Sequence, residues 1–299
     1  MIPLKILAFL KRNGFVLFLL LAFIVADRAI AWADPMSASL RFYKNDFAKT
    51  LLHHDFRTSG PVFFGNSAVT GAYIEEQAQV PLVEMGLSYG KLTDLQAILE
   101  QGLYRPEGQL VVGIDSHTML DPLQTDGSYP WFKTWYQPYV YFYRDYMRDT
   151  FEEWLKNALH GDFASYQPRW SDKMLYFGRK TPEELQSKFA EYEKMFGWMT
   201  VQRDLKDNIA AIRWITQYCS EQGIPLKVVW MPYNPGFPKP AYWAPLKESV
   251  TNTLETYKVP TLDLTDKFEP VDFHDIVHVN RETGAPKFTR EVDAWLRSF

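Results

Sequence analysis

The segment PVFFGNSA, residues 61–68, decides the fold, because an apolar run ends there at a glycine and two polar residues follow. The apolar run predicts a buried strand, and Asn66 and Ser67 are residue types that begin helices. A strand that leads directly into a helix indicates an α/β protein, with the Ser67 hydroxyl at the carboxyl edge of a parallel sheet. Taken alone, these residues favour simple helix capping over chemistry, since both types cap helices well.

The rest of the chain repeats this alternation of apolar runs and helical patterns. Strands are predicted over residues 61–64, 81–85, 109–114, 225–231 and 259–264. Helices are predicted near residues 91–101, 205–222, 241–257 and 285–296. This order predicts a five-stranded parallel sheet with right-handed crossovers, helices on its faces, and a ligand site at the carboxyl ends of the strands.

An insertion of about residues 120–200 interrupts the alternation. A helix should begin after Thr181, where Thr181, Pro182 and Glu184 form a capping box. Aromatic rings in the insertion suit either a sugar-stacking, membrane-interface or partner surface, or the core of a small helical subdomain. They are Trp131, Trp135, Tyr136, Tyr139, Tyr141, Tyr143, Tyr146, Trp154, Trp170, Tyr176 and Trp198.

Composition limits the classes of function. With 299 residues, 46% of them hydrophobic, the chain can bury a full core, and we expect one large domain over residues 34–299. The net charge of -4 and the lack of a basic cluster beyond Lys11 and Arg12 exclude a nucleic-acid footprint. The single cysteine, Cys219, falls in a helical pattern and is expected to be a small core residue.

Residues 1–33 predict a membrane-directed segment. Lys5, Lys11 and Arg12 precede an uncharged run over residues 14–26. The motif AWA at residues 31–33 fits a signal-peptide cleavage site, whereas the length of residues 14–33, about that of a bilayer span, favours an uncleaved anchor. In both cases the rest of the chain should face outward from the cytoplasm.

A second polar motif, DFHDIVHVN at residues 272–280, lies between the last predicted strand and the last predicted helix. Asp275 precedes His278 by three residues, close enough to orient the imidazole through one ring nitrogen while the other faces Ser67. Such a base and orienting acid are what a serine needs in order to act as a nucleophile. A metal site formed by Asp272, His274, Asp275 and His278, or a solvated polar loop, are the alternatives.

A rival nucleophile is Ser88 in GLSYG, residues 86–90, which matches the G-x-S-x-G elbow of α/β-hydrolases. That fold needs several strands before its nucleophile, and here only one precedes it. Ser67 is therefore favoured over Ser88.

The two motifs together resemble the SGNH (GDSL-like) hydrolase superfamily, over residues 58–299. The resemblance implies a three-layer α/β/α fold and acyl transfer to or from oxygen without a cofactor. It implies that Ser67 is the nucleophile, His278 the base and Asp275 its orienting acid. It also implies that the Gly86 N–H helps to form the oxyanion hole.

Two departures from the family pattern affect the oxyanion side. Asn66 stands where the family usually has Asp, and Asp115, in GIDS at residues 113–116, stands where a donor is usual. An ionised Asp115 cannot donate a hydrogen bond, so either Asn66 or His117 replaces it or efficient esterase activity is lost.

These departures, with the amino-terminal segment, resemble the branch of the D-alanyl-lipoteichoic-acid transfer and alginate O-acetylation proteins. That resemblance implies a cell-envelope or exported polysaccharide as substrate and a multi-pass membrane O-acyltransferase as partner. Two hypotheses follow. One is an acyltransferase or esterase that works through acyl-Ser67, and the other is a catalytically weak scaffold that binds polysaccharide.

Overall fold

The computed structural model describes residues 4–33, 46–55, 57–123, 152, 155–161 and 175–299. The chain divides into two compact units, residues 1–44 with 129–168 and residues 45–128 with 169–299. Each unit is described by itself.

The first unit contains helix α1 (Leu4–Ala33), which covers the segment expected to be membrane-directed. Its large apolar side chains between Phe15 and Val25 are exposed. The sequence predicts a membrane segment here, but within the described ranges no helix combines the length and apolarity that a membrane crossing requires. Most of the insertion's aromatic residues, from Trp131 to Tyr146 together with Trp154 and Trp170, lie outside the described residues.

The second unit contains a five-stranded sheet whose pairs are all parallel. Its strands are β1 (Ser59–Asn66), β2 (Val83–Leu87), β3 (Arg105–Ile114), β4 (Leu226–Trp230) and β5 (Thr261–Asp263). Their order across the sheet is β2-β1-β3-β4-β5, so β1, β3 and β4 are central. The predicted five-stranded parallel sheet is confirmed.

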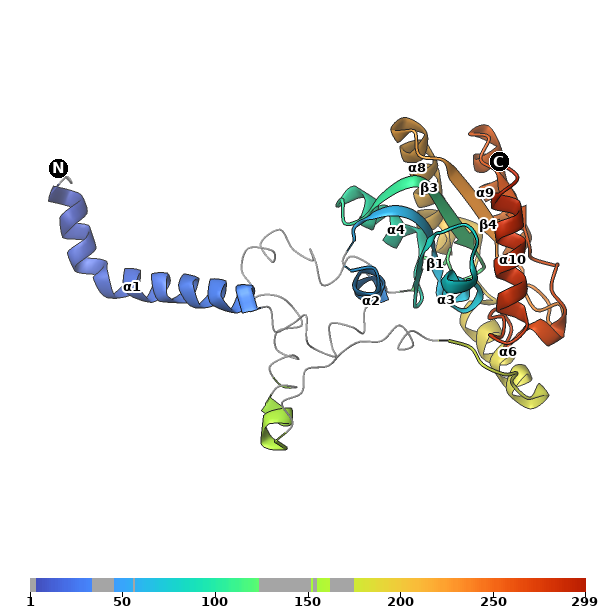
Figure 1. Cartoon of the computed structure of the whole chain (residues 1–299), viewed down its shortest axis with the longest axis horizontal. Coiled ribbons are helices and arrows are strands. Elements are labelled where there is room, and N and C mark those ends of the chain that lie inside the picture. Colours follow the sequence, from blue (N-terminus) through green and yellow to red (C-terminus); the bar gives the residue numbers. More distant parts are fainter. Residues whose placement is uncertain (1–3, 34–45, 56, 124–151, 153–154, 162–174) are drawn as a thin grey trace. The chain divides into compact units, whose positions relative to one another are not determined.

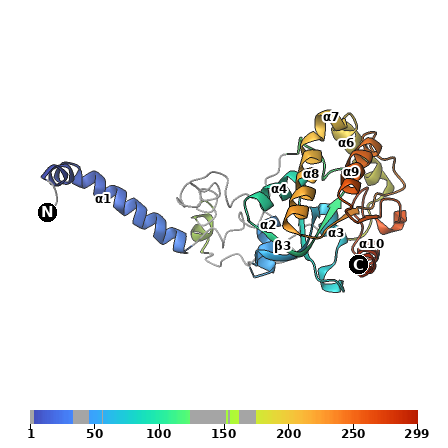
Figure 2. The same ribbon diagram turned by 90° about the horizontal axis from the view of Figure 1, so that it is seen from above.

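Helices cover both faces of this sheet, as Figure 1 and Figure 2 show. Helices α3 (Ser67–Ala72) and α10 (Gly284–Leu296) contact each other on one face. There Phe63, Val111 and Val229 join Phe288 in one buried apolar cluster. Helices α4 (Leu92–Glu100), α8 (Lys206–Gln222) and α9 (Trp243–Thr256) form the other layer, in which α8 contacts both of its neighbours. The result is a three-layer α/β arrangement.

Several strands begin or end at other residues than predicted, because hydrogen bonding to the neighbouring strand sets their limits. Strands β1 and β3 begin earlier than predicted because Ser59 pairs with Arg105 ahead of a register shift. Strand β2 continues to Leu87 because Gly86 and Leu87 pair with Gly65 and Asn66. Strand β5 is shorter than predicted, since its pairing with β4 covers only residues 261–263.

The shorter elements complete the second unit. Helix α2 (Asp46–His53) contacts the edge strand β2, and the one-turn helices are η3 (Glu75–Gln77), α7 (Val201–Asp204) and η6 (Pro270–Asp272). The predicted helix after Thr181 is α6 (Pro182–Phe196), and its capping box is confirmed. Helix α8 ends at Gly223 in the left-handed conformation, and Cys219 is buried within the helix, as expected.

Candidate active site

The strand-to-helix turn places Ser67 at the first position of α3, immediately after β1. Asn66 caps that helix through its Oδ1, which accepts a hydrogen bond of 2.8 Å from the Ala68 N–H. The Val69 side chain packs against two glycines, Gly65 in β1 and Gly113 in β3. A Cβ added at Gly65 would lie 2.3 Å from the Val69 side chain, and one added at Gly113 would lie 2.5 Å from it, so both positions require glycine. This close packing holds the start of α3 against the carboxyl ends of β1 and β3.

Ser67, His278 and Asp275 are joined in one hydrogen-bonded series. The Ser67 Oγ lies 2.9 Å from His278 Nε2, although the two residues are 211 positions apart in sequence. The other ring nitrogen, Nδ1, lies 2.9 Å from Asp275 Oδ2. A proton on Nδ1 satisfies the carboxylate, which leaves the Nε2 lone pair to accept from the serine hydroxyl. The structure thus brings together the three residues that the two motifs supply.

The carboxylate of Asp275 is buried and held in its ionised form. Burial alone would raise its pKa, but the His278 ring and two backbone N–H donors together hold the pKa well below its ordinary value. Those donors are Val277 at 3.0 Å and His278 at 2.9 Å. A permanently charged Asp275 can stabilise a protonated His278 during a proton transfer.

Asn234, which follows β4, positions the Asp275 loop. Its Nδ2 donates to the Asp275 carbonyl at 3.0 Å, and its backbone N–H donates to the Ile276 carbonyl at 2.9 Å. Asn234 could not be predicted from the sequence, because a single asparagine after a strand carries no distinguishing pattern.

The Gly86 N–H is not free to act as an oxyanion donor, which corrects the expectation drawn from the family. It donates to Oε1 of the buried Glu84 at 2.5 Å, and Thr70 Oγ1 lies 3.2 Å from the same oxygen. Close packing still requires glycine at this position, since a Cβ there would lie 2.2 Å from Thr70 Oγ1. The Glu84 carboxylate reaches two residues forward along its own strand, which the strand pattern does not reveal.

Asp115 is an acceptor that ties the end of β3 to the Ser67 turn. Its Oδ1 accepts from the Asn66 Nδ2 at 2.9 Å, from the Thr118 N–H at 2.7 Å and from the Thr118 hydroxyl at 2.6 Å. One N–H of the Asn66 amide is thus used by the Asp115 carboxylate, which as an acceptor offers no donor to a substrate. That the second amide N–H of Asn66 serves as the oxyanion donor stays a prediction.

His117 packs into the side of α6. Its ring makes edge contacts with Tyr192 and Phe196, with centroids 4.9 and 5.1 Å apart. Burial lowers the pKa of His117, so the imidazole is neutral at neutral pH. With Ser116 and Tyr242 it lines a small enclosed cavity beneath α6.

Tyr176 is a site residue whose role the sequence analysis did not foresee, since it appeared there only as one of many aromatics. Its ring stacks on the His278 ring with centroids 3.8 Å apart and planes inclined by 16°. The side chain is buried, so this ring closes the face of the imidazole to solvent.

The rival serine has a different environment. Ser88 is exposed, and its backbone N–H donates to Asp46 at 2.7 Å. The positive φ of 56° belongs to Tyr89, whereas in a nucleophile elbow the serine itself occupies the strained turn. Within the described ranges, Ser67 is the serine that is hydrogen-bonded to a histidine ring.

The alternative metal site at the second motif is not assembled. His274 Nδ1 faces the Phe177 carbonyl at 2.9 Å, and Asp272 pairs with Lys287 at 3.0 Å. In the part of the chain that the structure describes, the group with suitably close ligand atoms is His53, His54 and Glu75, all within 4.8 Å of one another. There His54 Nε2 lies 3.3 Å from Glu75 Oε1.

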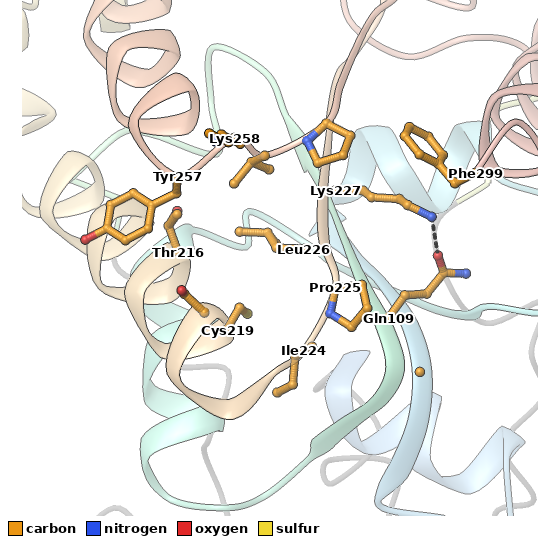
Figure 3. Close-up of a pocket in the computed structure, with 14 residues that line it drawn as sticks. Gln109, Thr216, Cys219, Ile224, Pro225, Leu226, Lys227, Tyr257, Lys258 and Phe299 are labelled. Carbon is orange, nitrogen blue, oxygen red and sulfur yellow. Dashed lines mark hydrogen bonds between the residues drawn. The ribbon is translucent and has the colours of Figure 1, made fainter.

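A larger hollow, of about 490 Å³, lies at the opposite, amino edge of the sheet (Figure 3). Gln109, Leu226, Lys227 and Phe299 line it, and Lys227 bonds Gln109 at 3.0 Å. No Asp, Glu or His side chain lines it, so this hollow offers no acid–base pair of side chains.

Comparison with known proteins gives distant likenesses. No family model and no curated protein sequence matches the chain. An acetyl xylan esterase, AlAXEase, is similar over 80% of this chain and 98% of its own, at 13% identity and a TM-score of 0.40. A GDSL-like lipase described as putative, from Parabacteroides merdae, is similar over 80% and 96%, at 11% identity and a TM-score of 0.39.

Proposed function

We propose that this protein is a serine acyl-transfer enzyme of the SGNH (GDSL-like) type. The observation that carries the proposal is the series from Ser67 Oγ through His278 to the Asp275 carboxylate, with both links at 2.9 Å. A weakly nucleophilic hydroxyl is thus paired with an imidazole base, and the imidazole with a charged carboxylate.

In the first half-reaction the Ser67 oxygen attacks the carbonyl carbon of an ester, and His278 Nε2 takes the serine proton. The carbonyl oxygen carries the negative charge until the bond to the leaving alcohol breaks, and His278 returns the proton to that alcohol. The product is acyl-Ser67. In the second half-reaction an acceptor hydroxyl, from a sugar or from water, loses its proton to His278 and attacks the acyl carbon. The bond to Ser67 then breaks, and His278 passes the proton to the departing Ser67 oxygen.

The substrate and setting that we propose rest on the sequence. The resemblance to envelope-modifying proteins supports a cell-surface or exported polysaccharide as acceptor or donor, and a small acyl group such as acetyl. Lys5, Lys11 and Arg12 ahead of the uncharged residues 14–26 support an outward-facing position, tethered by an amino-terminal anchor. A multi-pass membrane O-acyltransferase is the partner that would supply an acyl group to such a protein.

A catalytically weak, polysaccharide-binding scaffold is the second candidate. One observation favours it: the Gly86 N–H, an expected oxyanion donor, is bonded to Glu84 within the protein. Loss of one oxyanion donor slows acyl transfer.

Hydrolysis of nitrophenyl acetate by the full chain separates these candidates. The enzyme reading predicts turnover that Ser67→Ala abolishes and Ser88→Ala leaves intact, with an acetyl adduct detected by mass spectrometry in the wild type. Equal rates for wild type and Ser67→Ala, with no adduct, would favour the scaffold.

A further inference from the structure

Two histidines and a glutamate lie together away from the Ser67 series. His53 is the last residue of α2, His54 follows it, and Glu75 begins the one-turn helix η3. Each residue offers one ligand atom, and these atoms lie within 4.8 Å of one another. The two imidazole rings meet edge to face, with centroids 4.9 Å apart. The proposed acyl transfer uses none of these three residues.

The contact between His54 and Glu75 has the spacing of two ligands on one metal ion. His54 Nε2 lies 3.3 Å from Glu75 Oε1. Zinc binds imidazole nitrogen and carboxylate oxygen at about 2.0–2.2 Å, so two ligands of a tetrahedral ion stand about 3.3–3.5 Å apart. An ion therefore fits between these two atoms with little movement. His53 is exposed, so its side chain can turn to supply the third ligand.

The Glu75 carboxylate is held by its other oxygen. Oε2 accepts a hydrogen bond of 3.1 Å from the Glu84 N–H of β2, and such bonds orient a carboxylate that binds a metal. From α2, the Thr50 hydroxyl donates to the Glu84 carbonyl at 3.4 Å. Helices α2 and η3 thus meet at the same residue of the edge strand, which brings the ligands of the two helices together.

The donor set indicates which kind of ion would bind. Imidazole nitrogens suit transition metals such as zinc, whereas Mg²⁺ and Ca²⁺ prefer oxygen ligands. An ion pair with Glu75 would use only one of the two histidines, whereas a metal ion uses both. His54 and Glu75 are half-buried beside the exposed His53, so an ion can reach the group from solvent.

We propose that His53, His54 and Glu75 form a structural zinc site that fastens the end of α2 to η3 beside the edge strand β2. One nitrogen of each imidazole and one carboxylate oxygen bind the ion, and water takes the fourth position. The site shares no residue with the series from Ser67 to Asp275. It therefore stands or falls independently of the proposed acyl transfer.

Calorimetric titration of Zn²⁺ into the full chain, purified without a histidine tag and stripped with a chelator, tests the proposal. We expect one Zn²⁺ per chain and a higher melting temperature when it is bound. His53→Ala, His54→Ala and Glu75→Gln should each weaken the affinity by about 100-fold or more, since even loss of an outer partner costs about 10- to 100-fold. His160→Ala is the matched control, because His160 is an exposed histidine whose Nδ1 faces the Lys156 carbonyl at 2.7 Å.

The Glu75→Gln variant separates binding from folding, because glutamine keeps an oxygen that can accept from the Glu84 N–H. If it melts like the wild type without metal but gains no thermal shift from Zn²⁺, the site is supported. Zinc binding by wild type and His160→Ala that all three ligand variants lose supports it as well. Absence of binding by the wild type, or equal binding by Glu75→Gln, would overturn the site. Equal affinity for Mg²⁺ would overturn the assignment to a transition metal.

Discussion

The two edges of the sheet differ in what they offer. At the carboxyl edge, Ser67, Asp275 and His278 form a largely buried, hydrogen-bonded polar network. At the amino edge lies a hollow of about 490 Å³ with no acid–base pair (Figure 3). The polar residues that follow the strand ends therefore mark the site of the proposed chemistry, as expected for a parallel α/β sheet.

The largest expected contrast between the edges concerns the nucleophile and its base. Ser67→Ala or His278→Ala should lower kcat by about 10⁴-fold or more, because these residues act as a unit and removing either one disables both. Initial rates on nitrophenyl acetate measure this effect. If either variant kept more than about a tenth of the wild-type rate, the reaction would not depend on the carboxyl edge.

Next in size is the orienting carboxylate. Asp275→Asn should lower kcat by about 10²- to 10⁴-fold, because an amide cannot stabilise the protonated His278 and can turn the ring to the wrong tautomer. Steady-state kinetics of Asp275→Asn and of Asn234→Ala would separate two effects, the loss of the Asp275 charge and a shift of the loop that carries Asp275. A wild-type rate in Asp275→Asn would contradict the role given to this carboxylate.

The same substitution at the two edges should have different effects. Gly65→Ala would bring a Cβ to 2.3 Å from Val69 and should cost about 1–3 kcal/mol of unfolding free energy, with a loss of activity as Ser67 moves. Gly108→Ala meets no atom within 4 Å but sits at a φ of +83°, so it should cost about 1–2 kcal/mol through backbone strain alone, with activity kept. Denaturant melts and esterase rates of both variants test these two predictions. Equal losses of activity in Gly65→Ala and Gly108→Ala would contradict them.

Acid should weaken the carboxyl edge through Asp275. Its pKa is lower in the folded protein than in the unfolded chain, so its stabilising contribution is present above its ordinary value of 3.8 and is lost as the pH falls below it. Between about pH 5 and about pH 2, wild type should therefore lose more unfolding free energy than Asp275→Asn does. Urea melts across that range measure the difference, and parallel curves would show that the folded-state pKa is not lowered.

The smallest effect is expected at the amino edge. Lys227→Ala removes a partly exposed ammonium that bonds Gln109 and lies 4.5 Å from the Phe299 ring centroid. Such surface contacts contribute about 0–1 kcal/mol, so stability should change little and the esterase rate not at all. A clear fall in kcat would show that this hollow takes part in the reaction.

Much of the fold could be predicted from the sequence because its signals are local. Apolar runs bounded by glycine or proline predict the five strands, and Thr181 and Gly223 mark two helix ends by capping geometry. The bounds of β1 and β3 could not be predicted, since the pairing of Ser59 with Arg105 decides where they begin.

The candidate active site could likewise be predicted only in part. Ser67, Asp275 and His278 could be predicted because each stands in a short motif at a strand end. The bond from Gly86 to Glu84 and the stacking of Tyr176 on His278 could not, because each depends on where a side chain points in the folded protein. Tyr176 also follows a stretch of the chain with no helical or strand periodicity, so no pattern singles it out.

The most direct test of the central claim is to locate the acyl group after a short reaction with an activated acetyl ester. Rapid quenching, proteolysis and peptide mass spectrometry would be applied to wild type and His278→Ala. We expect one acetyl group on Ser67 in the wild type and almost none in His278→Ala. Acetylation of Ser88 in place of Ser67, or turnover with no acetylated serine, would contradict the account.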